Sequence, residues 1–177
     1  SELPSPLTSL FDPTAPQLDP KDLAAKCEWV IQTLQAHTAD DWNQLEAITR
    51  KQAQSPAWHA HRIGRITGTS FYTACTSQDP VTIIKTVMKY EDQDLSHLKP
   101  IQWGRTQEDP ARAAYIELMQ KEHTDFVCSP TGLIVKERAP FFAASPDGIW
   151  QCKCHGSRHI KKGTLEIKCP YKYRDSF

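Results

Sequence analysis

The sequence has 177 residues, enough for one domain with a hydrophobic core and a small extension. Its formal net charge at pH 7 is zero, so nucleic-acid binding would have to come from local basic patches. It contains neither a run of about 18 apolar residues, as a membrane span requires, nor a basic and then apolar leader. We therefore expect an intracellular protein of the cytoplasm or nucleus, not secreted, whose cysteines are reduced thiols.

The first part of the chain indicates an arm followed by helices. Residues 1–20 are rich in proline and lack hydrophobic periodicity, which predicts a Pro-rich arm. Asp19 before a proline, and Thr38 with an acid three residues later, are helix-start signals. Residues 21–55 are therefore interpreted as a helical extension, and residues 56–177 as the main domain.

Residues 62–69 read R-I-G-R-I-T-G-T and precede a predicted helix over 69–77. Backbone N–H groups and the helix dipole favour an anion at such a helix start, and arginines and a hydroxyl would add to this preference. The arginines and hydroxyl side chains of this stretch are therefore candidates for an anion site. The alternative is a tight turn between helices, with arginines that only contact solvent.

A longer helix is predicted within the stretch 102–119, with its start at Thr106. Thr106 with Asp109 three residues later forms a predicted capping box, and Pro110 would fall within the first turn. Glu108 would then lie at the helix start, free to reach inward. The alternative for Glu108 is simple complementation of the helix dipole.

Two stretches near the C-terminus, S-P-D-G at 145–148 and L-E-I-K-C-P at 165–170, predict a metal site. Side chains alternate along a strand, so Glu166 and Lys168 should share one face while their apolar neighbours face a core. If the runs on either side of the intervening loop pair as strands, Asp147 joins them beside a turn at Gly148. Carboxylates near a lysine suit a hard divalent cation. The alternative is an exposed edge strand with a loop aspartate.

The loop between these stretches is basic and contains four residues that could bind zinc. They are Cys152, Cys154, His155 and His159, and Lys161 and Lys162 follow them. C-x-C is tighter than the usual C-x(2–4)-C spacing, and the adjacent Cys154 and His155 are poorly placed to bind one ion together. We interpret the loop as a basic hairpin that touches the DNA backbone, with zinc unlikely and this set of four as the alternative.

The order S-P-D-G, then a loop, then E-x-K-C-P resembles the PD-(D/E)xK nuclease superfamily, and within it the YqaJ-like viral recombinase group that includes the lambda-type exonucleases. The segment W-G-R-T-Q-E-D-P-A-R is similar to the family pattern W-G-x-x-x-E-x-x-A-R, and I-T-G-T to I/V-T-A-S. The resemblance implies an α+β fold (an α/β core), restriction-endonuclease-like, with an N-terminal helical extension. Because the chain ends nine residues after Lys168, we expect the helix and strand that follow in the family to be missing.

The resemblance also implies the chemistry. Mg²⁺ or Mn²⁺, as one or two ions, would be held by Asp147, Glu166, the backbone carbonyl of Ile167 and Glu108, and Lys168 would be catalytic. The expected function is a metal-dependent deoxyribonuclease, a 5′-to-3′ exonuclease on linear duplex ends in recombination or DNA processing. The alternative is a catalytically silent DNA-binding or recombination-scaffold module, which the short C-terminus favours.

The resemblance assigns substrate contacts and partners as well. Arg62, Thr69 and Ser145 would bind the terminal phosphate, with Arg65 as a second candidate. The basic run 153–174, which includes Lys161 and Lys162, would contact the backbone phosphates of DNA without reading the sequence. The expected partners are double-stranded DNA ends, a single-strand annealing protein, the C-terminal remainder of the fold or another chain, and further copies in a homo-oligomer. No membrane partner is expected.

Overall fold

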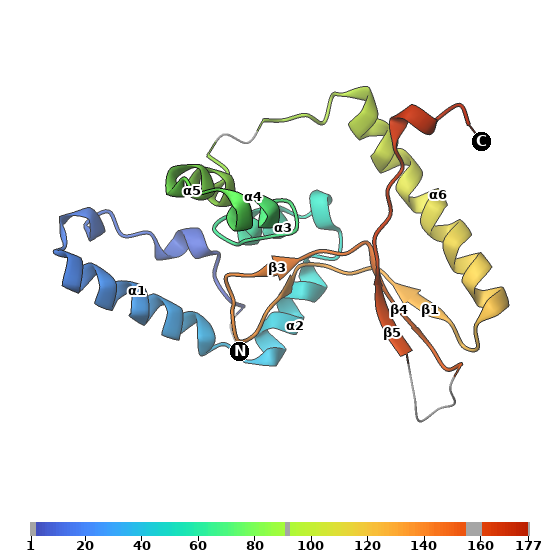
Figure 1. Cartoon of the computed structure of the whole chain (residues 1–177). Coiled ribbons are helices and arrows are strands. Elements are labelled where there is room, and N and C mark those ends of the chain that lie inside the picture. The colour runs from blue at the N-terminus through green and yellow to red at the C-terminus, as the bar shows by residue number, and fades with distance from the viewer. Residues whose placement is uncertain (1–2, 91–92, 155–160, 177) are drawn as a thin grey trace. The chain divides into compact units, whose positions relative to one another are not determined.

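Helices and two small antiparallel sheets make up the computed structural model, which describes residues 3–90, 93–154 and 161–176 (Figure 1). The α+β class expected from the sequence is confirmed at this level. The chain divides into two units. The first unit comprises Ser1–Asp92 and Thr131–Ser145, and the second comprises Gln93–Pro130 and Pro146–Phe177.

The helices of the first unit begin where the sequence signals predict. The side chain of Asp19 accepts hydrogen bonds from two backbone N–H groups, and Thr38 and Asp41 form the predicted capping box. The arm contains two short 3-10 helices, and a third follows α2. These elements are η1 (Leu7–Leu10), η2 (Ala15–Gln17), α1 (Pro20–Gln35), α2 (Ala39–Ile48), η3 (Gln52–Gln54), α3 (Pro56–Arg62), α4 (Phe71–Thr76) and α5 (Pro80–Met88).

A two-stranded sheet completes the first unit. Strand β2 (Ile134–Val135) pairs antiparallel with β3 (Ala143–Ala144). The core of this unit is formed by α2 and the hairpin, with Trp58 packed against it; its buried members are Trp42, Leu45, Leu133, Val135 and Ala143. The hairpin carries Ser145 at its end.

The second unit contains the long helix α6 (Lys99–Glu122). The predicted capping box at Thr106 is wrong, because the helix begins seven residues earlier, with Pro100 in its first turn. Thr106 instead donates a hydrogen bond to the Gln102 carbonyl, 2.8 Å away, inside the helix. Pro110 lies in the helix interior, so Glu108 is a mid-helix residue rather than one at the helix start.

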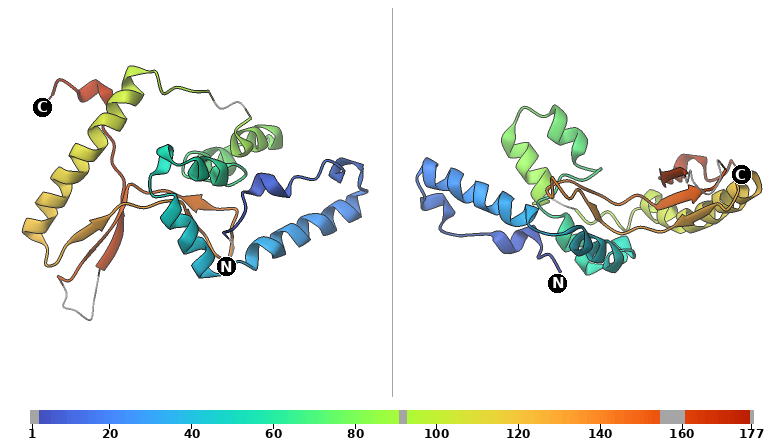
Figure 2. Two further views of the ribbon diagram at one scale, coloured as in Figure 1. Left: turned by 180° about the vertical axis from the view of Figure 1, so that it is seen from behind. Right: turned by 90° about the horizontal axis from the view of Figure 1, so that it is seen from below.

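A three-stranded antiparallel sheet in the order β1-β4-β5 lies in the same unit, formed by β1 (Val127–Ser129), β4 (Gly148–Cys152) and β5 (Lys161–Leu165). The pairing of β4 with β5 confirms the predicted neighbouring strands. The strand itself ends at Leu165, however, so Glu166 and Lys168 follow it in extended chain without ladder pairing. A last 3-10 helix, η4 (Tyr171–Tyr173), lies beside α6, and Figure 2 shows this contact from behind.

Gly148 is the first residue of β4 and not part of the turn expected there. A Cβ atom at this position would lie 2.8 Å from Cys128 Sγ and 3.3 Å from the Ser129 carbonyl oxygen. The glycine therefore permits the close approach of β1. Among the described residues, no helix combines the length and the apolar character needed to cross a bilayer.

Candidate metal centre and phosphate-binding residues

Asp147 is held at the end of the β4–β5 pair. Its backbone N–H donates to the Leu165 carbonyl at 2.9 Å, directly beyond the Gly148–Leu165 pair of the ladder. Its carboxylate oxygen Oδ2 accepts a short hydrogen bond from the Ile167 N–H. These two bonds fix the carboxylate beside the E-x-K segment, as the sequence predicts.

The E-x-K segment keeps the alternation of a strand although it has left the ladder. Leu165 and Ile167 are half-buried, whereas Glu166 and Lys168 are exposed. Lys168 Nζ donates to Glu166 Oε1, and the two form an ion pair. The two side chains thus lie together in the second unit with Asp147, as expected.

Glu108 reaches the same group from α6. Arg112, one turn later, donates to its Oε1 at 2.6 Å and to Asp109 at 2.5 Å. The pKa of Glu108 is raised, first by burial and then by the negative charge of Asp147, while Arg112 partly offsets both. The charge of Asp147 therefore acts on Glu108 across the space between α6 and the start of β4.

The negative charges of all three carboxylates act on the pKa of Lys168. Its pKa is raised, mainly by the hydrogen bond to Glu166, and further by the charges of Asp147 and Glu108. Lys168 is therefore protonated near neutral pH and can donate hydrogen bonds, but it is a poor general base.

The residues fit a hard divalent cation. Asp147, Glu166 and Glu108 provide carboxylate oxygens, the ligands that Mg²⁺ and Mn²⁺ prefer. The pKa of Glu108 is raised first by burial and then by the charge of Asp147, and a bound cation would favour its ionised form. Glu166 forms an ion pair with Lys168, and Glu108 forms one with Arg112. A bound ion would share the two carboxylates with these basic side chains or displace them.

In the first unit, Trp58 connects the residues predicted to bind a terminal phosphate. The Arg62 guanidinium lies over the Trp58 ring, 4.0 Å from its centroid, and donates to Thr69 Oγ1 at 3.2 Å. The indole N–H of Trp58 donates to Ser145 Oγ at 2.8 Å. Arg62, Thr69 and Ser145 are thus brought together around a side chain that the sequence had not singled out, because the contact joins residues 87 positions apart.

Arg65 is a buried residue with two fixed hydrogen bonds. It is 1% exposed, and it donates to the Pro140 carbonyl at 2.8 Å and to the His61 carbonyl at 2.6 Å. Its burial lowers the pKa to about 10. Within the part of the chain that the structure describes, its Nη2 atom has no hydrogen-bond partner.

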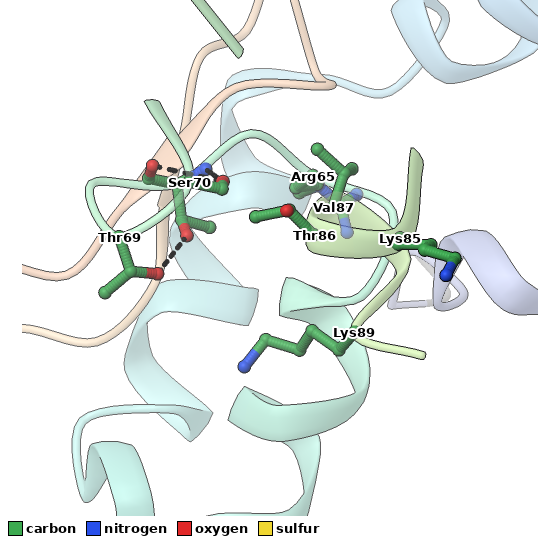
Figure 3. A pocket seen from close by; sticks show the side chains of 8 residues that line it. Arg65, Thr69, Ser70, Lys85, Thr86, Val87 and Lys89 are labelled. Carbon is green, nitrogen blue, oxygen red and sulfur yellow. Dashed lines mark hydrogen bonds between the residues drawn. The ribbon is translucent and has the colours of Figure 1, made fainter. Parts of the chain in front are cut away.

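A cavity of about 370 Å³ beside Arg65 has a basic and hydroxyl-rich lining (Figure 3). Thr67 Oγ1 and Thr69 Oγ1 lie 3.1 Å apart, and the Thr67 N–H donates to Ser70 Oγ at 2.9 Å. The lining residues are Arg65, Thr67, Thr69, Ser70, Lys85, Thr86, Val87 and Lys89. Lys85 and Lys89 were not selected from the sequence; Lys85 lies on α5, and Lys89 is the C-terminal cap residue of that helix.

The remaining candidates have different surroundings. Lys161 and Lys162 are exposed on β5, opposite Cys152 and Gln151. Cys152 and Cys154 lie close together with His123, a residue that the sequence had not connected with them. His155 and His159, the other two residues of the alternative zinc set, lie outside the described residues.

The YqaJ-like viral recombinase domain profile matches residues 57–176, and the chain belongs to this family. Membership suggests a nuclease role in recombination.

The chain is similar in structure to the Shutoff and Exonuclease Protein from Kaposi's sarcoma-associated herpesvirus, with a TM-score of 0.51 and 19% sequence identity. The match covers 88% of this chain but 30% of the herpesvirus chain, so the likeness concerns the fold of that portion. No curated protein sequence matches the chain.

Proposed function

We propose that this chain is the metal-binding portion of a deoxyribonuclease that hydrolyses DNA phosphodiesters, acting as a 5′-to-3′ exonuclease on linear duplex ends. The observation that supports the proposal is the hydrogen bond from the Ile167 N–H to Asp147 Oδ2, which holds this carboxylate beside the ion pair of Glu166 with Lys168. Family membership supports a DNA substrate.

Asp147, Glu166 and Glu108 would hold Mg²⁺ or Mn²⁺, as one or two ions, together with the backbone carbonyl of Ile167. Such an ion supplies charge neutralisation at the phosphate and lowers the pKa of bound water. The Ile167 N–H fixes one oxygen of Asp147 and leaves the other for a ligand role. Glu108 lies on a long helix, which gives the group a rigid support.

Lys168 would position the attacking water or a phosphate oxygen as a hydrogen-bond donor. Its pKa is raised, so the ammonium form persists at neutral pH and the proton of the attacking water must go elsewhere, to a carboxylate or to solvent. Positive charge beside the phosphate would also stabilise the transition state.

The first unit would bind phosphate groups of the DNA. Arg62 and Thr69 already form a hydrogen-bonded pair, and Ser145 is fixed by Trp58, so little side-chain entropy would be lost on binding a terminal 5′-phosphate. The cavity with Lys85 and Lys89 offers two more positive side chains for backbone phosphates. Lys161 and Lys162 would add sequence-independent contacts.

The test is digestion of linear 5′-phosphorylated duplex with Mg²⁺ or Mn²⁺, beside closed circular DNA and an EDTA control. We expect loss of the linear substrate only, slower for an otherwise identical duplex with 5′-hydroxyl ends. If the chain binds duplex DNA and Mn²⁺ but digests neither substrate, the catalytic proposal is wrong for this chain and the scaffold function is favoured.

Cation binding should weaken as the pH falls, and Glu108 should set part of this dependence. Its pKa is raised, so it takes up a proton at a higher pH than an ordinary glutamate, and the protonated form is a poor ligand. We expect Glu108→Gln to bind Mn²⁺ less tightly than the wild type at pH 8. The two affinities should converge as the pH falls and Glu108 becomes protonated. Titration calorimetry at several pH values measures this, and a gap that stays constant with pH would exclude Glu108 as a ligand.

A further inference from the structure

A second group of metal-ligand side chains lies in the second unit, at the end of α6. His123 is the C-terminal cap residue of α6, Cys152 is the last residue of β4, and Cys154 follows two positions later. One ligand atom from each side chain lies within 4.8 Å of the other two. His123 Nδ1 and Cys154 Sγ are 3.1 Å apart.

We propose that His123, Cys152 and Cys154 form a zinc site. Two thiolates and an imidazole are soft to borderline ligands, which select Zn²⁺ over the hard cations that carboxylates prefer. Around a tetrahedral zinc ion, sulfur atoms lie about 3.8 Å from one another and about 3.6 Å from a ligand nitrogen. The observed separations need only small side-chain adjustments to reach this geometry.

Of the two sequence objections to zinc, the tight C-x-C spacing concerns Cys152 and Cys154, yet their ligand atoms lie within 4.8 Å of one another and of His123. The other objection, that Cys154 and the adjacent His155 are poorly placed to bind the same ion, does not apply to this set of ligands. In the structure the imidazole comes from His123, which lies 29 residues before Cys152 in the chain. The ion would therefore join two separate segments, as structural zinc sites do.

The backbone around the three side chains is already organised. The Lys153 N–H donates to the Thr124 carbonyl at 2.8 Å, and the Thr124 N–H donates to Cys154 Sγ at 3.4 Å. An N–H···S bond of this kind stabilises a thiolate and orients it. Lys153 Nζ also pairs with Asp125 Oδ2 at 3.0 Å, so the segment after α6 is tied to the segment after β4.

Burial at the site allows one further ligand. Cys152 is only 1% exposed, whereas Cys154 is exposed and His123 is half-buried. One side of the group is thus enclosed by protein and the other faces solvent. A fourth position, filled by water or another side chain, would complete the tetrahedron on the open side.

Zinc here would be a structural ion and not a catalytic one. It would cross-link the end of α6 to the end of β4. Glu108 lies on this helix, and Asp147 directly precedes this strand. The inference is independent of the proposed nuclease function, because its readouts are metal content, spectra and stability.

The decisive test is titration of the reduced, metal-stripped protein with Co²⁺, followed by Zn²⁺. We expect one equivalent of Co²⁺ to produce a thiolate-to-cobalt charge-transfer band, which Zn²⁺ then removes. A saturating excess of zinc should raise the Tm by about 5 °C. Cys154→Ser and His123→Gln should lose the band, whereas Cys75→Ser, an exposed cysteine of the first unit, should keep it.

Three outcomes would overturn the proposal. One is the absence of a charge-transfer band in the wild type, and another is an undiminished band in Cys154→Ser. The third is loss of the band in a His155→Ala, His159→Ala double variant together with its retention in His123→Gln. Because Cys154 is exposed, its serine variant should fold, so a lost band can be assigned to a lost ligand.

Discussion

Asp147→Asn is expected to reduce the rate of DNA digestion by roughly 1000-fold or more. The substitution removes the negative charge that a cation needs, but it keeps the shape of the side chain. The asparagine oxygen can still accept the hydrogen bond that Ile167 donates to Asp147 Oδ2. The loss should therefore be one of metal binding and catalysis, with the Tm of the metal-free protein changed by only a few degrees.

Two measurements distinguish this result from a folding defect. The affinity for Mn²⁺ should fall by about 10-fold or more, while affinity for duplex DNA in EDTA stays close to that of the wild type. Lys121→Ala is the matched control, since Lys121 is an exposed residue of α6 that pairs with Glu117. Undiminished digestion by Asp147→Asn would remove Asp147 from the metal centre.

Lys168→Ala should separate catalysis from metal binding. Lys168 donates to Glu166 and is not itself a metal ligand, so its removal frees Glu166 for the ion. Digestion should fall by about 100-fold or more while Mn²⁺ affinity is equal or higher. A parallel loss of metal affinity and activity would contradict a donor role for Lys168.

The position of Asp147 beside the E-x-K segment could be predicted because most of its causes are local, whereas the position of Glu108 in its helix could not. Alternation along an extended chain places Glu166 and Lys168 together, and it persists even though the ladder ends at Leu165. Asp147 joins them through the β4–β5 pairing, which the apolar runs indicated. The exact strand end could not be predicted, since it depends on which backbone groups of the neighbouring strand remain available.

Contacts between distant segments were not predictable from the sequence. Trp58 bonds to Ser145, and His123 lies beside Cys154, yet no periodicity connects either pair. The start of α6 shows another limit. Thr106 and Asp109 satisfy a capping-box pattern, but Pro100 begins the helix earlier, and the pattern then falls inside the helix. A capping-box pattern does not mark a helix start when the helix has already begun upstream of it.

Gly132→Ala is expected to destabilise the first unit by about 3 kcal/mol. A Cβ atom at Gly132 would lie 2.0 Å from the Glu46 carbonyl oxygen and 2.4 Å from Thr49 Oγ1. Neither atom is free to move. Glu46 and Thr49 lie at the end of α2, and the buried Thr49 hydroxyl accepts from the Leu133 N–H and donates to the Leu45 carbonyl.

The clash would separate α2 from the hairpin and expose the core that Leu45 and Leu133 share. Gly68→Ala is the matched control in the same unit, because a Cβ atom there meets nothing within 4 Å. Urea unfolding followed by tryptophan fluorescence measures both variants, and Trp42 in the core reports on the first unit. Equal midpoints for the two variants would mean that α2 and the hairpin do not pack as closely as the structure has them. A large loss in Gly132→Ala alone would show that the hairpin bearing Ser145 is held in place by the end of α2.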